Sequence, residues 1–329
     1  MKKSYLKFVL LPSTNLQISD IDALGSLNTM LKRGLIREGS YNGDIGCQLK
    51  NLGIDWDGEV PVGAIERFAC GLEPEKGNWC IKAHPVTLVP NRDNLVLQPG
   101  VGGLIAKQTE IEIIDGLNEY LADRGLLFRW LSPMHWIVES ETQYQLDTPD
   151  IADVFNQNIG EHLLGGEDSG LWRSIANEIQ MWLHHRGIGL VAGEQNEPAP
   201  NSLWFWGAGS LNVSSVNSSI DLVVSDSVFV SGLAKLAGIS YITPKDFEQK
   251  MESHLKQHEN IVCFVNDSCE TLLLDDLDSH LLKPALALQQ GGKLNKLSVV
   301  FPSGRKLVSS HRDHLKFWRK ASQLEALLS

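Results

Sequence analysis

The sequence predicts an α/β protein with a doubly wound, mostly parallel sheet. Residues 6–11 form an apolar run closed by Pro12, and residues 18–33 then carry apolar side chains at helical spacing. Later in the chain, strand-like runs alternate with helical segments: 221–224, 227–237, 240–242, 245–258, 261–266 and 278–290, before a strand pair at 297–301 and 306–309. Strands separated by helices of these lengths are typical of a parallel sheet covered on both faces.

A different pattern interrupts this alternation and indicates an inserted domain. Two strand-like runs, a helix and two further strand-like runs follow one another at 79–89, 95–97, 107–122, 126–131 and 135–139. This ββαββ order is typical of a small α+β domain. We therefore expect a discontinuous core of residues 1–72 and 143–329, with an insertion at 73–142.

Composition excludes several classes of protein. The chain has 329 residues, of which 43% are hydrophobic and 21% charged, as in an ordinary globular protein. Its net charge of -11 disfavours nucleic acid and acidic membranes as partners. The five cysteines form no CxxC pair, so we expect neither a disulfide framework nor a zinc site. The apolar start ends at Pro12 without a cleavage site, which favours a cytoplasmic protein without a membrane span.

The segment 198–210 is the first candidate for a ligand site. It is an apolar run with Asn201 at its entrance and Gly207 and Gly209 at its exit, and loops at strand ends are where α/β proteins bind ligands. A core strand with an ordinary glycine turn fits the pattern equally well. The preceding helix, predicted at 171–186, carries His184, which is either a ligand contact or a surface histidine.

Several acidic and histidine residues follow predicted strands. They are Asp44, Asp267, His311 and His314. Carboxylates and imidazoles that converge at strand ends can hold the divalent ions of a phosphoryl-transfer site, although an aspartate at a helix start is also an ordinary cap.

The order of several segments resembles a known family. The segments are 43–53, Asn177–Met181 with His184, 200–209 and 231–239. Together they resemble the archaeal-type cofactor-independent phosphoglycerate mutases of the alkaline-phosphatase superfamily, and more closely the RpfE-type regulatory proteins. The resemblance implies a sheet of the alkaline-phosphatase type. Within it, Asp267 matches a late metal-binding aspartate, and His311 or His314 matches the last metal-binding histidine.

The sequence departs from this family at the reactive positions. The resemblance implies a nucleophilic serine directly before Asp44, but Gly43 stands there, and a glycine cannot form a phospho-enzyme. It also implies an aspartate at the end of the first strand, where Ser13 lies, and a late metal-binding pair, where residues 301–305 lie.

These departures lead to one main expectation and two alternatives. We expect a mutase-like regulatory or ligand-sensing pseudoenzyme without a cofactor, which binds a small phosphorylated or anionic ligand. The expected pocket consists of Asn201, Gly207, Gly209 and His184, with Asp44 opposite. One alternative is an active mutase or phosphatase that uses Mn or Zn on Asp44, Asp267, His311 and His314. The other is a structural protein that binds a protein partner, whose identity the sequence does not indicate.

Overall fold

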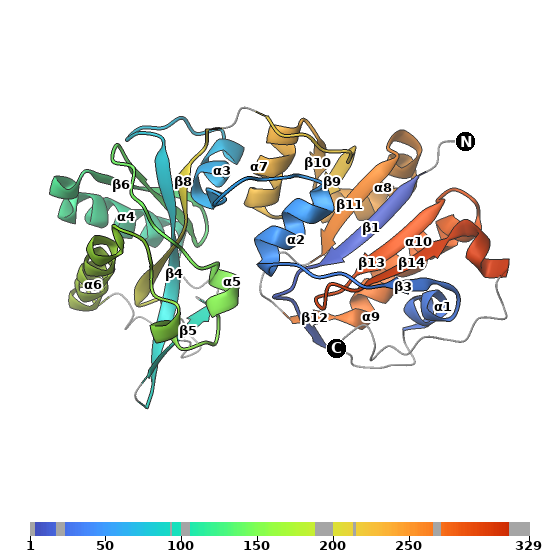
Figure 1. Cartoon of the computed structure of the whole chain (residues 1–329), viewed down its shortest axis with the longest axis horizontal. Helices are drawn as coiled ribbons and strands as arrows, with labels where there is room; N and C mark the ends of the chain where they lie inside the picture. Colours follow the sequence, from blue (N-terminus) through green and yellow to red (C-terminus); the bar gives the residue numbers. More distant parts are fainter. Residues whose placement is uncertain are drawn as a thin grey trace. The chain divides into compact units, whose positions relative to one another are not determined.

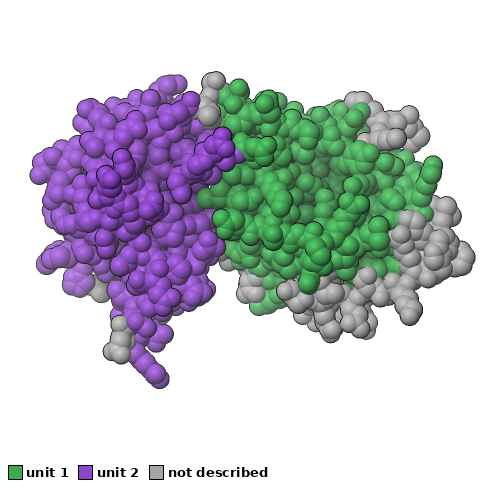
Figure 2. All heavy atoms as spheres, in the orientation of Figure 1, with its two compact units in different colours: residues 1–55, 215–329 green, residues 56–214 purple. Residues whose placement is uncertain are grey.

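The computed structural model forms two compact units, which Figure 2 shows in green and purple. Unit 1 consists of Met1–Asp55 and Ser215–Ser329, and unit 2 consists of Trp56–Ser214. The structure describes residues 4–17, 24–92, 94–99, 106–187, 200–212, 215–265 and 271–315.

Unit 1 is built on a seven-stranded sheet with the order β10-β9-β11-β1-β13-β14-β3 (Figure 1). Neighbouring strands from β10 to β13 run parallel, and β14 runs antiparallel to both of its neighbours. The strands are β10 (Ser240–Ile242), β9 (Leu222–Val224), β11 (Asn260–Val265), β1 (Tyr5–Leu10), β13 (Lys296–Val300), β14 (Lys306–Ser310) and β3 (Leu35–Arg37). A separate parallel pair consists of β2 (Asn15–Gln17) and β12 (Thr271–Leu273).

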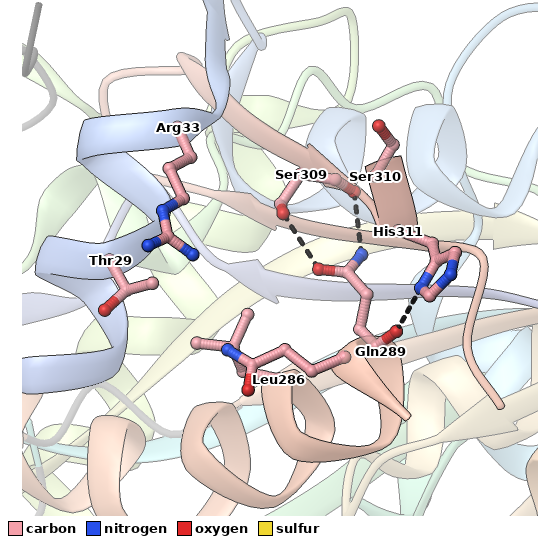
Figure 3. Close-up of a pocket in the computed structure, with 8 residues that line it drawn as sticks. Thr29, Arg33, Leu286, Gln289, Ser309, Ser310 and His311 are labelled. Carbon is pink, nitrogen blue, oxygen red and sulfur yellow. Dashed lines mark hydrogen bonds between the residues drawn. The ribbon is translucent and has the colours of Figure 1, made fainter. Parts of the chain in front are cut away.

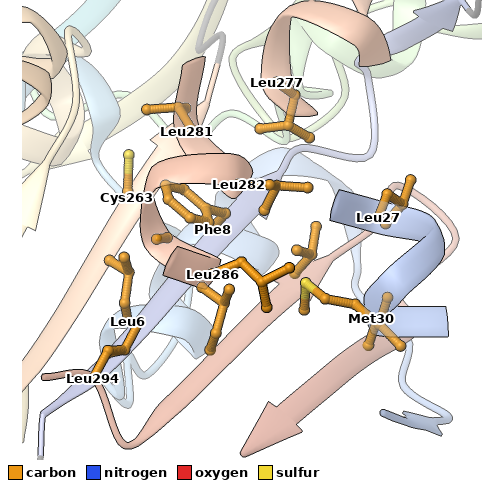
Figure 4. Close-up of a cluster of buried hydrophobic side chains, with 14 of the residues drawn as sticks. Leu6, Phe8, Leu27, Met30, Cys263, Leu277, Leu281, Leu282, Leu286 and Leu294 are labelled. Carbon is orange, nitrogen blue, oxygen red and sulfur yellow. The ribbon is translucent and has the colours of Figure 1, made fainter. Parts of the chain in front are cut away.

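Helices cover both faces of this sheet. The helices of unit 1 are α1 (Gly25–Arg33), α2 (Gly43–Leu52), α7 (Val228–Ala237), α8 (Pro244–Gln257), α9 (Leu274–Asp276) and α10 (Lys283–Gln290). Leu6 and Phe8 of β1 pack in one apolar cluster with residues of α1, α8 and α10, part of which is shown in Figure 4. Lys7 points the other way, because strand side chains alternate, and its Nζ donates to the carbonyl of Asn51 in α2. The sheet is therefore doubly wound, as predicted.

A π-helical turn in unit 1, Leu277–Leu282, provides the cap that α1 lacks in its own sequence. Leu24 occupies the N-cap position of α1 and makes no side-chain cap bond. Asp278 instead accepts hydrogen bonds from the backbone N–H of Ser26, at 3.0 Å, and of Leu27, at 2.6 Å. A buried carboxylate that is 252 and 251 positions away in sequence thus satisfies the first amides of this helix.

Unit 2 is built on a five-stranded antiparallel sheet around the long strand β4 (Trp79–Asn91). One edge of β4 pairs with β7 (His135–Ser140) and β5 (Asn94–Pro99), the other edge pairs with β8 (Ser202–Ser210), and β6 (Leu126–Ser132) pairs with β7. The helices of unit 2 are α3 (Val62–Ala69), α4 (Lys107–Tyr120), α5 (Ile151–Val154) and α6 (Ser169–His185), with 3-10 turns at Ala122–Arg124 and Ile159–Glu161.

The two faces of the unit 2 sheet pack against different helices. Trp79 and Ile81 of β4 lie in an apolar cluster with side chains of α4 and α6. Cys80 and Lys82 point to the opposite face, where α3 approaches so closely that a Cβ on Gly63 would lie 3.1 Å from both the Cys80 Sγ and the Lys82 backbone nitrogen. We call this second side of the sheet the α3 face. The close approach of α3 favours glycine at position 63.

The predicted fold class is confirmed. The chain is an α/β protein with a large, mostly parallel sheet and an inserted antiparallel region, consistent with an alkaline-phosphatase-type fold. The predicted ββαββ order corresponds to β4, β5, α4, β6 and β7. Among the described residues, no helix has the length and apolar character needed to cross a bilayer.

The second unit is larger than the predicted insertion at 73–142. Helix α6 and strand β8, which the sequence analysis assigned to the core, belong to unit 2. The reason is that β8 pairs with β4 while α6 packs on the sheet that the two strands share. Strand β8 is largely buried on both faces, and such a strand has the same continuous apolar pattern as a strand of a parallel sheet.

Replacing Asp278 with alanine is expected to destabilise unit 1 by roughly 1–3 kcal/mol, because two buried backbone N–H groups lose their acceptor. Urea unfolding followed by circular dichroism measures the loss, and hydrogen exchange should show faster exchange at Ser26 and Leu27. The matched control is Asp276→Ala, at an exposed position two residues earlier, which should change stability by less than about 0.5 kcal/mol. Equal effects of the two variants would contradict the capping role.

Candidate functional site

Asp44 lies at the carboxyl edge of the parallel sheet in unit 1, where the sequence analysis placed a candidate site. It is in the first turn of α2, and Ser13 lies in the turn that follows β1. The Ser13 backbone N–H donates to Oδ1 of Asp44 over 2.9 Å, and the Ser13 hydroxyl donates to Oδ2. Both carboxylate oxygens therefore connect the β1 turn to the start of α2, where the helix dipole also favours a negative charge.

Gly43, the residue directly before Asp44, has a left-handed backbone. Its φ is 67°, a conformation that glycine adopts readily and that strains other residues. This is the position at which the family resemblance implies a nucleophilic serine. The local backbone thus favours the glycine that the sequence has there.

His311 lies near the amino ends of the parallel strands, at the opposite end of the sheet from Asp44. It follows β14, which runs antiparallel, and the last residue of that strand, Ser310, pairs with Lys296 at the start of β13. Asp44 contacts the turn that follows the carboxyl end of β1. The six residues of that strand, roughly 20 Å of sheet, therefore separate the two side chains. The structure therefore does not bring His311 and Asp44 together.

A small polar cavity lies beside His311 (Figure 3). The His311 Nδ1 lies 2.6 Å from the carbonyl oxygen of Gln289. The side chain of Gln289 in turn exchanges two hydrogen bonds with Ser309. The cavity, also lined by Thr29 and Arg33, has a volume of about 20 Å³, which is room for about one water molecule and too little for a phosphorylated metabolite.

The other two predicted metal ligands are not placed by the structure. Asp267 lies outside the described residues, and of His314 the structure describes the backbone, in the 3-10 turn His311–Leu315, but not the side chain. Within the described part of the chain, no group of three or more histidine, cysteine, aspartate or glutamate residues is placed to hold a metal ion. The described residues therefore do not assemble the Mn or Zn site of the enzyme alternative.

In unit 2, Asn201 extends the pairing of β8 with β4. Its Oδ1 accepts from the Leu88 backbone N–H at 2.8 Å, and its Nδ2 donates to the Leu88 carbonyl at 3.0 Å. The Asn201 backbone N–H donates to the Val86 carbonyl. The side-chain amide thus substitutes for a backbone residue of the sheet.

Gly207 and Gly209 allow the start of α3 to pack against β8. Gly207 has a φ of 62°, and a Cβ at this position would lie 2.6 Å from the Cβ of Val62. A Cβ on Gly209 would lie 3.1 Å from the Cβ of Pro61. Gly207 also lies in a β-bulge, because two residues of β8, 207 and 208, stand opposite the single residue Ile81.

His184 does not lie with these residues. It is exposed on α6, the helix that packs on the face opposite α3, and its ring lies 6.1 Å from that of His185. Asp44, the residue expected opposite them, belongs to unit 1. In the structure, Asn201, Gly207 and Gly209 thus form and pack the sheet, while His184 is a surface histidine.

The α3 face contains a buried charged cluster that the sequence analysis missed. The Lys82 Nζ donates to Oε1 of Glu66 in α3 over 2.6 Å, and both residues are almost completely buried. Nδ1 of His135 lies 3.3 Å from the same Nζ and 3.7 Å from Oε2 of Glu66. The ring of His84 lies 5.9 Å from that of His135, and Lys82 also lies over the ring of Trp206.

The environment of this cluster shifts two pKa values. Burial alone would raise the pKa of Glu66, but the Lys82 ammonium and His135 outweigh it and lower that pKa to about 2. Burial lowers the pKa of His84 to about 3, and the positive charge of Lys82 adds to this effect. At neutral pH the cluster therefore combines an ionised carboxylate with a neutral His84.

One sequence signal could have led to this cluster. Lys82 and His84 stand at alternate positions within the mostly apolar run 79–89, so they point to one face of a buried strand. A buried lysine requires a partner. The sequence does not indicate that the partner is Glu66, because that residue lies in a different element.

The unfolding free energy should fall as the pH drops from about 6.5 towards 3, and His84→Gln should reduce this dependence. The unfolded chain protonates His84 below about pH 6.5, whereas the folded chain keeps it neutral down to about pH 3, so acid favours the unfolded state in this window. Glu66 adds a further loss between about pH 4.5 and 2 in both proteins. Urea denaturation at a series of pH values measures the difference, with exposed His185→Gln as the control. Parallel curves for His84→Gln and the unmodified chain would contradict the assignment.

Comparison with known proteins gives similarity at the level of the fold. No protein-family model and no curated protein matches the chain. The PH0037 protein from Pyrococcus horikoshii is similar in structure, with a TM-score of 0.51 and 14% identity, over 94% of this chain and 88% of that chain. A cofactor-independent phosphoglycerate mutase from Thermoplasma acidophilum DSM 1728 has a TM-score of 0.42 and 15% identity, over 94% of this chain and 90% of that chain. At these identities the similarity concerns architecture and not activity.

Proposed function

We propose that the chain is a phosphoglycerate-mutase-like regulatory protein, of the RpfE type, that senses a small phosphorylated or anionic ligand in the cytoplasm. The observation that carries the proposal is the contact between Asp44 and Ser13, in which both carboxylate oxygens accept hydrogen bonds from the turn after β1. With both oxygens used in these hydrogen bonds, the Asp44 carboxylate connects the turn after β1 to the start of α2.

The backbone at the neighbouring position supports the same proposal. A phosphomutase of this family needs a nucleophile to carry the phosphoryl group, and the matching position is Gly43, with its left-handed φ of 67°. A nucleophile elsewhere on the edge would attack from a different place, and a displacement of about 1 Å can cost about a hundredfold in rate. Under the proposal, the chain keeps a mutase-like fold, while the residues at this position stabilise that fold and do not carry a phosphoryl group.

The alternative of a metal-dependent enzyme is less well supported. With Asp44 and His311 that alternative would need both residues at one pair of ions, but the antiparallel direction of β14 places His311 at the opposite end of the parallel strands. Stoichiometric Mn or Zn in the purified chain would favour the alternative and count against the proposal.

The purified chain, incubated with Mn²⁺ and 3-phosphoglycerate, is expected to form no 2-phosphoglycerate above the background of a protein-free sample. Under the proposal Asp44 is structural, so Asp44→Asn and Ser13→Ala should each lower the unfolding free energy by about 1 kcal/mol without changing this background. Coupled spectrophotometric assays and urea unfolding measure the two quantities.

An active cofactor-independent mutase assayed in parallel shows that the conditions permit turnover. Saturable, manganese-dependent interconversion that disappears in Asp44→Ala would overturn the proposed function.

A further inference from the structure

Four side chains form a compact group on the α3 face of the unit 2 sheet. In the register of β4 with β8, Lys82 pairs with Trp206 and His84 pairs with Trp204. Residues directly opposite each other on neighbouring strands have Cβ atoms about 5 Å apart. The Lys82 Nζ lies 4.8 Å from the centre of the Trp206 ring, so the first pair is in direct contact.

The hydrogen-bonding groups of Lys82 are already used within the cluster. One proton of its ammonium group is donated to Glu66 and one points to Nδ1 of His135, and the positive charge also faces the Trp206 ring. Lys82 therefore supplies positive charge to the group and leaves the donation of further hydrogen bonds to its neighbours.

Three neighbouring polar atoms lack such partners. Among the residues that the structure describes, the Nε1 atoms of Trp204 and Trp206 and the Nδ1 of His84 are buried without a hydrogen-bond partner. Both tryptophans are only 8% exposed. A buried polar group without a partner costs about 1–3 kcal/mol, so two unpaired indoles and an imidazole on one face of the sheet are expensive unless something binds them.

The chemistry of these atoms restricts what can bind. An indole N–H donates and cannot accept, so a group that satisfies both tryptophans must present acceptor atoms, such as the oxygens of an oxyanion. The nearby negative charge is that of Glu66, which Lys82 balances at 2.6 Å. The Oε2 of Glu66 also lacks a hydrogen-bond partner among the described residues, and it faces the His135 Nδ1 at 3.7 Å.

We propose that Trp204, Trp206 and His84 form a binding site in unit 2 for the oxyanion group, carboxylate or phosphate, of a small ligand. The two indole N–H groups donate to its oxygens, and His84 completes the set as the tautomer with a proton on Nδ1. The Gly207 bulge, which directly follows Trp206, holds the strand against α3. The site deepens the proposed function, because it gives the sensed anionic ligand a place that is separate from Asp44.

Titration of the full chain, labelled with ¹⁵N at the tryptophan indoles, tests the site. Inorganic phosphate and glycerate are the two probes, sodium chloride is the control for ionic strength, and Trp204→Phe and Trp206→Phe assign the two signals. We expect the Trp204 and Trp206 indole signals to shift saturably with at least one probe. Each Phe variant, which keeps the aromatic ring but removes the donor, should weaken binding about tenfold or more. A response to one probe alone identifies the oxyanion class.

Trp172→Phe is the matched control. The Trp172 indole is also buried and without a partner among the described residues, but it lies in the cluster on the opposite face of the sheet. This variant should bind as the unmodified chain does. His84→Gln, which keeps a donor in a different geometry, provides a further variant should either Phe variant fold poorly.

The inference is overturned if neither probe shifts the two signals, if chloride shifts them equally, or if Trp172→Phe weakens binding as much as the other two variants. These outcomes are distinct from failure of the proposed function, which is measured by mutase turnover. Turnover together with oxyanion binding at the tryptophans would remove the proposed function and leave this site in place.

Discussion

The antiparallel pairing of β4 with β8 is the constraint on which the rest of unit 2 depends. It joins Trp79 to Ser210, and just beyond the paired residues the side chain of Asn201 contacts Leu88, 113 positions away in sequence. Because β8 closes the free edge of β4, the segment between them forms a compact unit with its own two-sided core. The same pairing sets the two tryptophans of β8 opposite Lys82 and His84, so the fold of the insertion and its candidate site have one common cause.

The buried acids of the chain illustrate why the surroundings of Glu66 are unusual. Asp278 accepts from two backbone amides, Glu110 from two indoles and one amide, and Glu139 from Arg67, Arg129 and two amides. Such sets of donors are the usual way to bury a carboxylate at little net cost. Around Glu66 the arrangement is less complete, since the ion pair with Lys82 lies beside polar atoms that have no hydrogen-bond partner within the described part of the chain. Groups of this kind are expensive in a purely structural core and useful in a binding site.

Local sequence patterns predicted most elements of this fold, because their signals lie within one segment. The run that became β1 and the ββαββ order are examples. The placement of β8 could not be predicted in this way, since a strand buried on both faces has the same pattern in either kind of sheet. For the site, the sequence led to Asp44 but not to its contact with Ser13, which lies 31 positions away. The partners of Lys82 come from α3 and β7, and no spacing in the sequence relates those elements.

The bulge at Gly207 changes which side chains of β8 point to each face of the unit 2 sheet. Phe205 and Ala208 are three positions apart, yet both lie in the cluster shared with α4 and α6, which strict alternation along a strand would not allow. The extra residue at the bulge shifts the alternation of side chains in β8 by one position, so the faces are exchanged beyond it. The side chains of Trp204 and Trp206, before the bulge, therefore share the face of Lys82 and His84, whereas Ala208, directly after Gly207, lies in the cluster on the other face.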